Sequence, residues 1–310
     1  MIINDKNNMK KFLKTLKQQW MLYLILLPSL IYLAIFCYAP MFGVIIAFKD
    51  YVPALGIFKS PNVGFEKFEM FFSSYYFKDI LINTLALSVI SLIINTPLPI
   101  ILALLINEVQ NHKFKRFVQT ISYAPYFISL VVLVGMFNMF LKTDGGLINH
   151  LLESIGISKV DFLGDSKYFR GIYVLSGLWQ GIGWWSIIYV GALSNVDKSL
   201  HEAAAIDGAS RLQRIRYINL PHLKPLITIT FIMAVGSLMS VGFEKVYLMQ
   251  TASNREVSEI IATYSYLVSF ETTKDFGFGT AVGLFNSVVN TILLIIANFV
   301  SKKINNESLF

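Results

Sequence analysis

Uncharged apolar stretches alternate with short polar loops along this 310-residue chain. Six stretches of at least 19 residues contain no Asp, Glu, Lys or Arg, and together they make up half of the chain. These stretches are 18–48, 80–107, 117–141, 171–196, 225–243 and 276–301. About 20 helical residues cross the hydrocarbon core of a bilayer, so the pattern predicts an all-α membrane protein with six transmembrane helices. Long continuous runs, rather than short alternating ones, argue against a membrane β-barrel.

The composition agrees with this pattern. Hydrophobic residues make up 55% of the chain and charged residues only 15%, with a mean hydropathy of +0.59. An ordinary soluble domain carries about a quarter charged residues, so the composition excludes a soluble enzyme and a nucleic-acid-binding domain. The single cysteine, Cys37, excludes a disulfide framework. The four histidines fall in loops without metal-ligand spacing, and no metal site is expected.

The distribution of charge predicts the orientation. If the lysine-rich N-terminal segment is cytoplasmic, the inner segments hold 15 Lys and Arg against 6 Asp and Glu, and the outer segments 11 against 13. The positive-inside rule favours this arrangement, with both termini in the cytoplasm. Residues 1–19 then form a cytoplasmic segment, and 20–305 form one transmembrane domain. Apolar residues at helical spacing from Met9 to Trp20 predict an interfacial helix, with a frayed tail as the alternative.

Two loops have a composition of their own. The first outer loop, about 49–79, ends in aromatic residues that predict a girdle at the membrane interface. They are Phe65, Phe68, Phe71, Phe72, Tyr75, Tyr76 and Phe77. The cytoplasmic loop, about 197–224, contains Ser199 with Glu202 and Ser210 with Gln213, two capping-box patterns that each predict a helix start. Gly208 predicts the end of the first helix, and the second is expected to stop near Pro221.

The same cytoplasmic loop carries one specific motif. It consists of Glu202-Ala203-Ala204, three residues, Gly208, nine residues, Ile218, one residue and Leu220-Pro221. This pattern resembles the EAA loop of the permease subunits of ABC importers, which have the type I permease fold. The segments NTLALSVISLIINTPLPIILALLINEV, KRFVQTISYAPYFIS and GTAVGLFNSVVN resemble the polysaccharide-type branch of the carbohydrate-uptake permeases.

The resemblance implies how the loop works. In that family the loop is a coupling helix that sits in a cleft of a separate ATPase subunit. Carried over, Glu202, Ala203, Ala204 and Gly208 are the coupling residues, and Ala205, Asp207, Leu220 and Pro221 support them. The alternative is that an alanine-rich turn merely connects two spans.

The resemblance also implies the partners and the location. It implies a second homologous permease, two ATP-binding subunits that hold ATP and Mg²⁺, and an extracytoplasmic solute-binding protein, in a bacterial cytoplasmic membrane. The chain itself has no Gly-Lys pair and therefore no Walker-type phosphate loop, so neither a cofactor nor a catalytic role is expected in it.

Candidate pathway residues follow from the chemistry of sugar sites, which combine aromatic faces with hydrogen-bonding groups. The candidates are Trp179, Trp184, Trp185, Tyr189, Glu244, Asn286 and Asn290. Each has a structural alternative: the rings can anchor interfaces, the asparagines can bridge helices, and Glu244 can pair with Lys245. The family branch includes uronate-containing oligosaccharides, but no predicted span has a basic residue in its interior, so neutral oligosaccharides fit equally well.

Two other classes of protein remain as alternatives. An ion-coupled secondary transporter or a channel would also have six spans, but it usually carries ionisable residues within them, and here the span interiors have none. A membrane-embedded enzyme is disfavoured because no catalytic constellation is present. Sensitivity of uptake to vanadate separates an ATP-driven importer from the first alternative.

Overall fold

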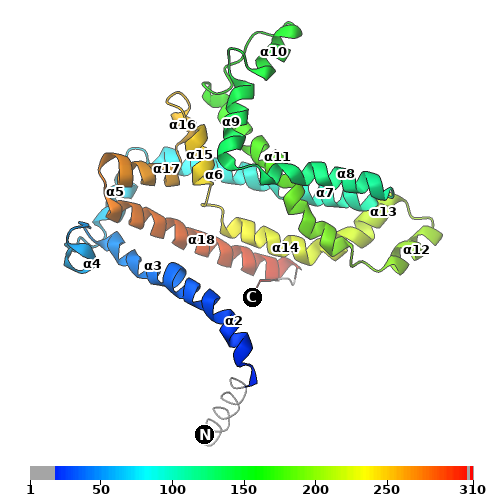
Figure 1. Ribbon diagram of the computed structural model, residues 1–310, viewed down its shortest axis with the longest axis horizontal. Helices are drawn as coiled ribbons and strands as arrows, with labels where there is room; N and C mark the ends of the chain where they lie inside the picture. The colour runs from blue at the N-terminus through cyan, green and yellow to red at the C-terminus, as the bar shows by residue number, and fades with distance from the viewer. Residues whose placement is uncertain (1–17, 306–307, 310) are drawn as a thin grey trace, which may run out of the picture.

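The computed structural model describes residues 18–305, 308 and 309, and this part of the chain is helical (Figure 1). It contains no strand, and an isolated β-bridge pairs Lys49 with Asn62. The first half comprises α2 (Trp20–Tyr32), η1 (Leu33–Tyr38), α3 (Ala39–Met41), η2 (Phe42–Phe48), α4 (Gly56–Lys59), α5 (Glu66–Ser73), α6 (Phe77–Asn95), α7 (Pro97–Glu108), α8 (His112–Tyr123), η3 (Ala124–Phe127), α9 (Leu130–Leu141) and α10 (Leu147–Ser154). The second half comprises α11 (Ser166–Leu193), α12 (Lys198–Ile206), α13 (Arg211–Arg214), η4 (Ile215–Asn219), α14 (Leu220–Gly236), α15 (Phe243–Met249), α16 (Arg255–Ser258), α17 (Ile261–Tyr266), η5 (Leu267–Thr272) and α18 (Phe276–Asn305). The interfacial helix predicted ahead of Trp20 lies outside the described residues.

Four helical segments of the described chain are long and apolar enough to cross a membrane. They are Trp20–Phe48, Phe77–Glu108, Arg211–Gly236 and Phe276–Lys303. The bent pair His112–Phe127 and Leu130–Leu141 would make a fifth. The fold is therefore all-helical with four to five candidate spans, and the six-span topology with cytoplasmic termini stays a prediction.

The apolar run 117–141 is divided between helices that meet at 99° instead of forming one straight helix. Pro125 lies in the 3₁₀ turn η3, and because proline has no backbone N–H it cannot donate a hydrogen bond that would continue the helix. Ser129 then starts α9, because its hydroxyl accepts the N–H of Val132 at 3.4 Å. The proline and the new cap together explain the bend.

The long helix α11 lies at the centre of the bundle, where it packs against α6, α7, α8 and α14 (Figure 1). It is long enough to span a bilayer but less apolar than the four candidate spans, because it contains five glycines as well as Ser176 and Gln180. At Gly183 a β-carbon would collide with the carbonyl oxygen of Ser122. Small residues on α11 therefore permit the close approach to α8, as their number in the sequence indicates.

The predicted aromatic girdle is wrong for Phe71, which is buried in the core. Its ring contacts Phe77, Phe278 and Phe285 at centroid distances of 5.1 to 6.1 Å. These rings belong to α5, the start of α6 and α18, so part of the cluster joins two consecutive helices to the distant α18. Tyr75, by contrast, is exposed.

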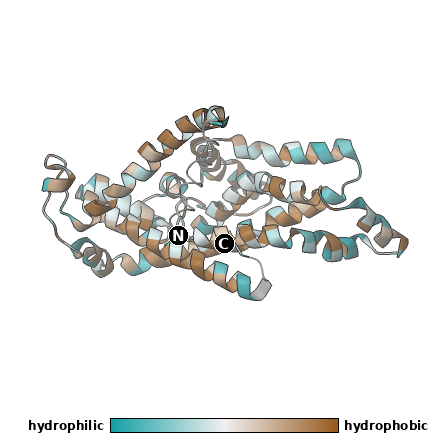
Figure 2. Ribbon diagram, turned by 90° about the horizontal axis from the view of Figure 1, so that it is seen from below, coloured by the Kyte–Doolittle hydropathy of each residue, from teal (hydrophilic) through white to brown (hydrophobic). Residues whose placement is uncertain are grey.

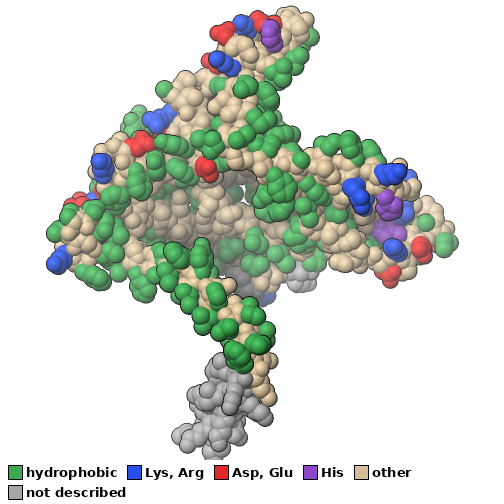
Figure 3. All heavy atoms as spheres, viewed as in Figure 1, with side chains coloured by type: hydrophobic (Ala, Val, Ile, Leu, Met, Phe, Trp, Pro, Cys, Tyr) green, Lys and Arg blue, Asp and Glu red, His purple; other side chains and the backbone are tan. Residues whose placement is uncertain are grey.

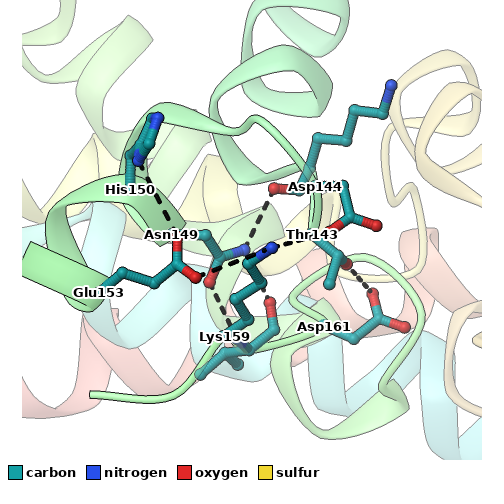
Figure 4. Close-up of polar contacts among 9 residues, drawn as sticks. Thr143, Asp144, Asn149, His150, Glu153, Lys159 and Asp161 are labelled. Carbon is teal, nitrogen blue, oxygen red and sulfur yellow. Dashed lines mark hydrogen bonds and ion pairs between the residues drawn. The ribbon is translucent and has the colours of Figure 1, made fainter. Parts of the chain in front are cut away.

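The loop between α9 and α11 is ordered by its own polar contacts (Figure 4). The Asn149 amide on α10 donates to the carbonyl oxygens of Lys142 and Val160 at 3.1 and 2.9 Å, and its oxygen accepts the N–H of Val160. Lys159 pairs with Asp144 at 2.9 Å. These contacts hold the two sides of the loop together, and α10 projects from the bundle at the top of Figure 1.

A buried lysine links α5 and the segment before it to the start of α18. Lys67 on α5 is 7% exposed at its side chain, and its ammonium lies 2.7 Å from Asp275 and 3.3 Å from the more exposed Asp50. Burial alone would lower the pKa of Lys67, but the two carboxylates outweigh it and raise the pKa. Asp275 also accepts the N–H of Phe278 in the first turn of α18. The triad therefore fixes where α18 begins.

We expect Lys67→Met to destabilise the protein by about 3 to 5 kcal/mol, because it leaves Asp275 enclosed without its cation. Thermal unfolding of the purified protein in detergent measures the loss. Lys59→Met, at an exposed lysine of α4, is the matched control and should leave the melting temperature unchanged. Equal melting temperatures for the two variants would contradict a stabilising role for the triad.

Candidate functional site

A cavity of about 670 Å³ opens between α6, α7, α11 and α14. Residues 237–245, which join α14 to α15 and begin α15, complete its wall. The polar part of the wall consists of hydroxyl, amide and aromatic side chains with one cation. These are Ser88, Ser91, Asn95, Thr96, Tyr173, Gln180, Trp185, Tyr189, Thr230, Ser237, Ser240 and Lys245. The volume falls within the range of small-molecule sites, and the wall suits a ligand rich in hydroxyl groups.

Two polar groups in this wall lack a partner. The Ser88 hydroxyl and the Asn95 amide oxygen are buried, and neither makes a hydrogen bond within the described part of the chain. Both residues belong to the part of α6 that borders the cavity. Buried polar groups are normally paired, so these two atoms are exceptions in the wall.

Two of the four predicted aromatic residues line the cavity. The Trp185 ring lies against Gly181, where a β-carbon would be 3.2 Å from its Cδ1, and the side chain is 59% exposed. Tyr189 is buried, with its hydroxyl 2.9 Å from the Thr230 hydroxyl on α14. Helix α11 thus contributes one aromatic face, and α11 and α14 together contribute one hydroxyl pair.

The other two aromatic candidates turn away to neighbouring elements and do not line the cavity. Trp184 stacks on Tyr126 of η3, with ring centroids 4.3 Å apart and planes within 2°. Trp179 meets Phe137 of α9 edge-on at 6.2 Å. Since Trp184 and Trp185 are adjacent on one helix, they face different directions.

The polar candidates on α15 and α18 also lie outside the cavity wall. Asn290 accepts the N–H of Met239 at 2.9 Å and donates to the Ser240 hydroxyl at 2.9 Å, so it holds the break between α14 and α15. The Asn286 oxygen is buried and makes no hydrogen bond with any described residue. Glu244 is exposed in the first turn of α15.

Lys245, the residue after Glu244, is buried where Glu244 is exposed. Lys245 is 7% exposed, and its ammonium donates to the Tyr173 carbonyl at 2.7 Å and lies 4.6 Å from the centre of the Tyr173 ring. It makes no ion pair with Glu244 or any other described residue, and no acid lines the cavity. Lys245 lies outside the candidate spans, and burial lowers its pKa to about 8.

The sequence analysis missed Lys245 as a site residue. It follows the apolar run 225–243 by two positions, and this placed it in the outer loop. The helix α14 ends earlier, at Gly236, and the irregular residues 237–242 return the chain toward α11. Tyr173, Gly177 and Gln180 recur at helical spacing on α11, and this spacing is the feature of the sequence that could have indicated that they share one face of the helix.

A second candidate region is the loop between α11 and α14. The first helix, α12, begins at Lys198 because the Asp197 carboxylate accepts the N–H of Ser199 at 2.9 Å. The capping box predicted for Ser199 and Glu202 is therefore wrong, since Asp197 takes the cap position. The capping box of Ser210 and Gln213 is confirmed, with bonds of 3.3 and 2.7 Å.

The end of α12 agrees with the sequence. Gly208 has φ +77°, the left-handed conformation that glycine adopts without strain, and no atom lies within 4 Å of the β-carbon position. The second helix does not stop at Pro221, however. A π turn, η4, precedes Pro221, and Arg211–Gly236 forms one helical segment. Pro221 closely follows this π turn, and the local widening of the helix accommodates the N–H that proline lacks.

The loop lies at one end of the molecule (Figure 1), and it exposes apolar side chains. No residue of α12 is buried, and Ile206 and Leu212 are 86% and 74% exposed. Figure 3 shows basic, acidic and histidine side chains gathered at this end, and Figure 2 shows hydrophilic positions concentrated there. The other predicted coupling residues, Glu202, Ala203, Ala205, Asp207, Leu220 and Pro221, are exposed, and Ala204 is half-buried.

The loop is attached at both ends to helices of the cavity wall. Only residues 194–197 separate α11 from α12. At the other end, the buried Asn219 lies within hydrogen-bonding distance, 3.5 Å, of the Glu108 carboxylate at the end of α7. A displacement of the loop would therefore act directly on α11, α7 and α14.

Comparison with known proteins gives the family. Residues 95–306 match the family described as binding-protein-dependent transport system inner membrane component. The chain is 43% identical over 309 residues to the polygalacturonan/rhamnogalacturonan transport system permease protein YteP of Bacillus subtilis, covering 100% of this chain and 96% of that protein. Protein LplB of Bacillus subtilis is also 43% identical, over 96% of this chain and 94% of that protein.

A solved structure supports the same assignment. A chain from a bacterial ABC transporter involved in the import of the acidic polysaccharide alginate superposes with a TM-score of 0.87 at 37% identity, covering 95% of this chain and 99% of that one. A second structure of the alginate transporter, in complex with an alginate pentasaccharide-bound periplasmic protein, superposes equally well. The chain therefore belongs to the family of binding-protein-dependent transport system inner membrane components, and it has the fold of an ABC importer permease.

Proposed function

We propose that this chain is the permease subunit of an ATP-driven importer for oligosaccharides and forms one half of the translocation pathway. The observation that carries the proposal is the exposed α12–α13 loop, which is attached at both ends to helices that line a cavity. The cavity offers hydroxyl, amide and aromatic groups, as a sugar site requires. ATP and Mg²⁺ bind to separate subunits in this proposal, and the chain itself is not catalytic.

The loop transmits the movement of an ATPase to the cavity. The slim, alanine-rich α12 enters a cleft of the ATPase, with Glu202, Ala203, Ala204 and Gly208 at the contact. Ala205, Asp207, Leu220 and Pro221 support its shape. Closure of the ATPase then shifts α12, and residues 194–197 pass the shift to α11 and its cavity face.

Besides this chain, the complete transporter contains three further kinds of component. A second homologous permease provides the other side of the pathway, two ATPase subunits drive it, and an extracytoplasmic protein delivers the sugar. The periplasmic protein present in one alginate transporter structure supports the delivery step. The bacterial cytoplasmic membrane, crossed six times with both termini inside, is the proposed location.

We expect vanadate to abolish uptake of the oligosaccharide in proteoliposomes that contain the complete transporter, because vanadate traps ATPase subunits. A protonophore should leave the initial rate of uptake unchanged in the same vesicles. Radiolabelled sugar retained on filters measures both rates. The opposite pattern would favour the ion-coupled alternative.

We expect Gly208→Asp to abolish ATP-dependent uptake while the permease still reaches the membrane. The change adds a charge and a side chain to a surface that must fit a partner, although nothing in the chain itself crowds Gly208. Uptake by a complemented deletion strain and immunoblots of its membranes provide the two measurements.

Gly156→Asp is the matched control for this variant. Gly156 also has a positive φ, +81°, and no atom lies near its β-carbon position, but it lies in the outer loop after α10. The two substitutions therefore cost similar backbone strain. Normal uptake by the Gly208 variant, or an equal loss in both, would refute the coupling role.

We expect Trp185→Ala to lower the uptake rate at limiting sugar by roughly threefold to tenfold, the loss of one aromatic face. Trp184→Ala should have a smaller effect, since that ring stacks on Tyr126 and does not line the cavity. Initial rates for the two variants, normalised to the amount of assembled transporter, test the assignment of the cavity. A larger loss in the Trp184 variant would contradict it.

A further inference from the structure

The lysine in the cavity wall has a chemical property that the other polar residues of the wall lack. Lys245 is the only charged side chain among the described residues that line the cavity. Its side chain can donate three hydrogen bonds, and the Tyr173 carbonyl takes one at 2.7 Å. A buried ammonium is costly unless an anion faces it, so this arrangement calls for a negative group from outside the chain.

The other buried lysine of the described chain, Lys67, has counter-ions beside it, so the lack of a described counter-ion at Lys245 is specific to the cavity wall. Lys67 is buried to a similar degree, yet it faces two carboxylates, at 2.7 and 3.3 Å. Among the described residues, Lys245 faces a carbonyl oxygen and the Tyr173 ring, which attract a cation more weakly than a carboxylate does. A methionine would fill the same space without the cost of burying a charge.

The structure also makes room for the ammonium at the cavity wall. At Gly177, one turn after Tyr173 on α11, a β-carbon would lie 3.0 Å from the Lys245 nitrogen. Glycine at this position lets the ammonium lie against α11, beside the hydrogen-bonding groups of the wall. The tip of the side chain is thus held in place by the carbonyl, the ring and the glycine.

We propose that Lys245 binds a carboxylate of the transported sugar and makes the cavity selective for acidic oligosaccharides. This inference rests on the proposed function, since it names the class of sugar that the cavity accepts. The carboxylate supplies the anion that the chain omits and forms a charge-assisted hydrogen bond with the ammonium. A neutral sugar in the same position leaves the buried charge unpaired.

The test compares uptake of a short oligogalacturonide with uptake of its methyl ester, which has the same sugar without the charge. Complete transporters with the cognate binding protein are reconstituted in proteoliposomes. In Lys245→Met we expect the ratio of acid to ester uptake to fall by at least about tenfold, the loss of one charge-assisted hydrogen bond. Lys245→Arg keeps the charge and should keep most of the ratio. The binding protein is the same throughout, so its own preference cancels.

A second variant tests the position of the ammonium without removing it. Gly177→Ala should displace the Lys245 tip by a few tenths of an ångström and lower the acid-to-ester ratio in the same direction, by a smaller factor. Gly191→Ala is the matched control, because no atom lies near its β-carbon position and it does not line the cavity. Alanine favours a helix, so both variants should fold.

The outcomes separate this inference from the proposed function. An unchanged ratio in both Lys245→Met and Gly177→Ala would overturn the role of Lys245. ATP-dependent uptake of a neutral arabino-oligosaccharide, but of neither the acid nor its ester, would overturn the acidic selectivity and leave the importer proposal standing. Failure of the complete transporter to import any oligosaccharide with ATP would overturn the proposed function itself.

Discussion

The arrangement of the bundle depends on how closely α11 approaches its neighbours. Gly183 brings this helix against the backbone of α8, where any side chain would collide with Ser122. The same helix borders the cavity through Tyr173, Trp185 and Tyr189 and leads within four residues into α12. Helix α11 therefore packs closely against α8, forms part of the polar cavity wall and leads into the exposed loop. A rigid connection of this kind is what a permease needs if an ATPase at one end is to change a binding cavity in the interior.

Two buried lysines illustrate how charge is used in this protein. Lys67 is neutralised within the chain and links α5 to the start of α18, so its charge serves stability. Lys245 has a similar burial, but no described acid lies beside it, and we propose that its charge serves a ligand instead. For both lysines, burial costs free energy because the ammonium group loses the water around it. The position of a counter-ion, rather than the presence of a lysine, decides which purpose the charge serves.

Local features of the sequence were predicted well where the interaction lies within a few residues. Gly208 and the box of Ser210 with Gln213 were predicted because a cap depends on neighbours in the chain. The box of Ser199 and Glu202 failed because Asp197 takes the cap position two residues earlier and accepts the N–H of Ser199, so Ser199 already lies inside the helix. Only some of the predicted pathway residues line the cavity, for a different reason. Successive residues on a helix point about 100° apart, so the sequence cannot say which of Trp184 and Trp185 faces a cavity.

The sequence by itself determined the membrane environment, the helical class and the family, because these follow from long uncharged runs and from one motif of fixed spacing. The tertiary structure decided which polar groups meet in the cavity. The chain leaves its helix at Gly236, and Asn290 holds the irregular segment that follows, so that Lys245 turns inward while Glu244 turns outward. A break of six residues redirects every side chain beyond it, and hydrophobic patterning carries no information about that direction.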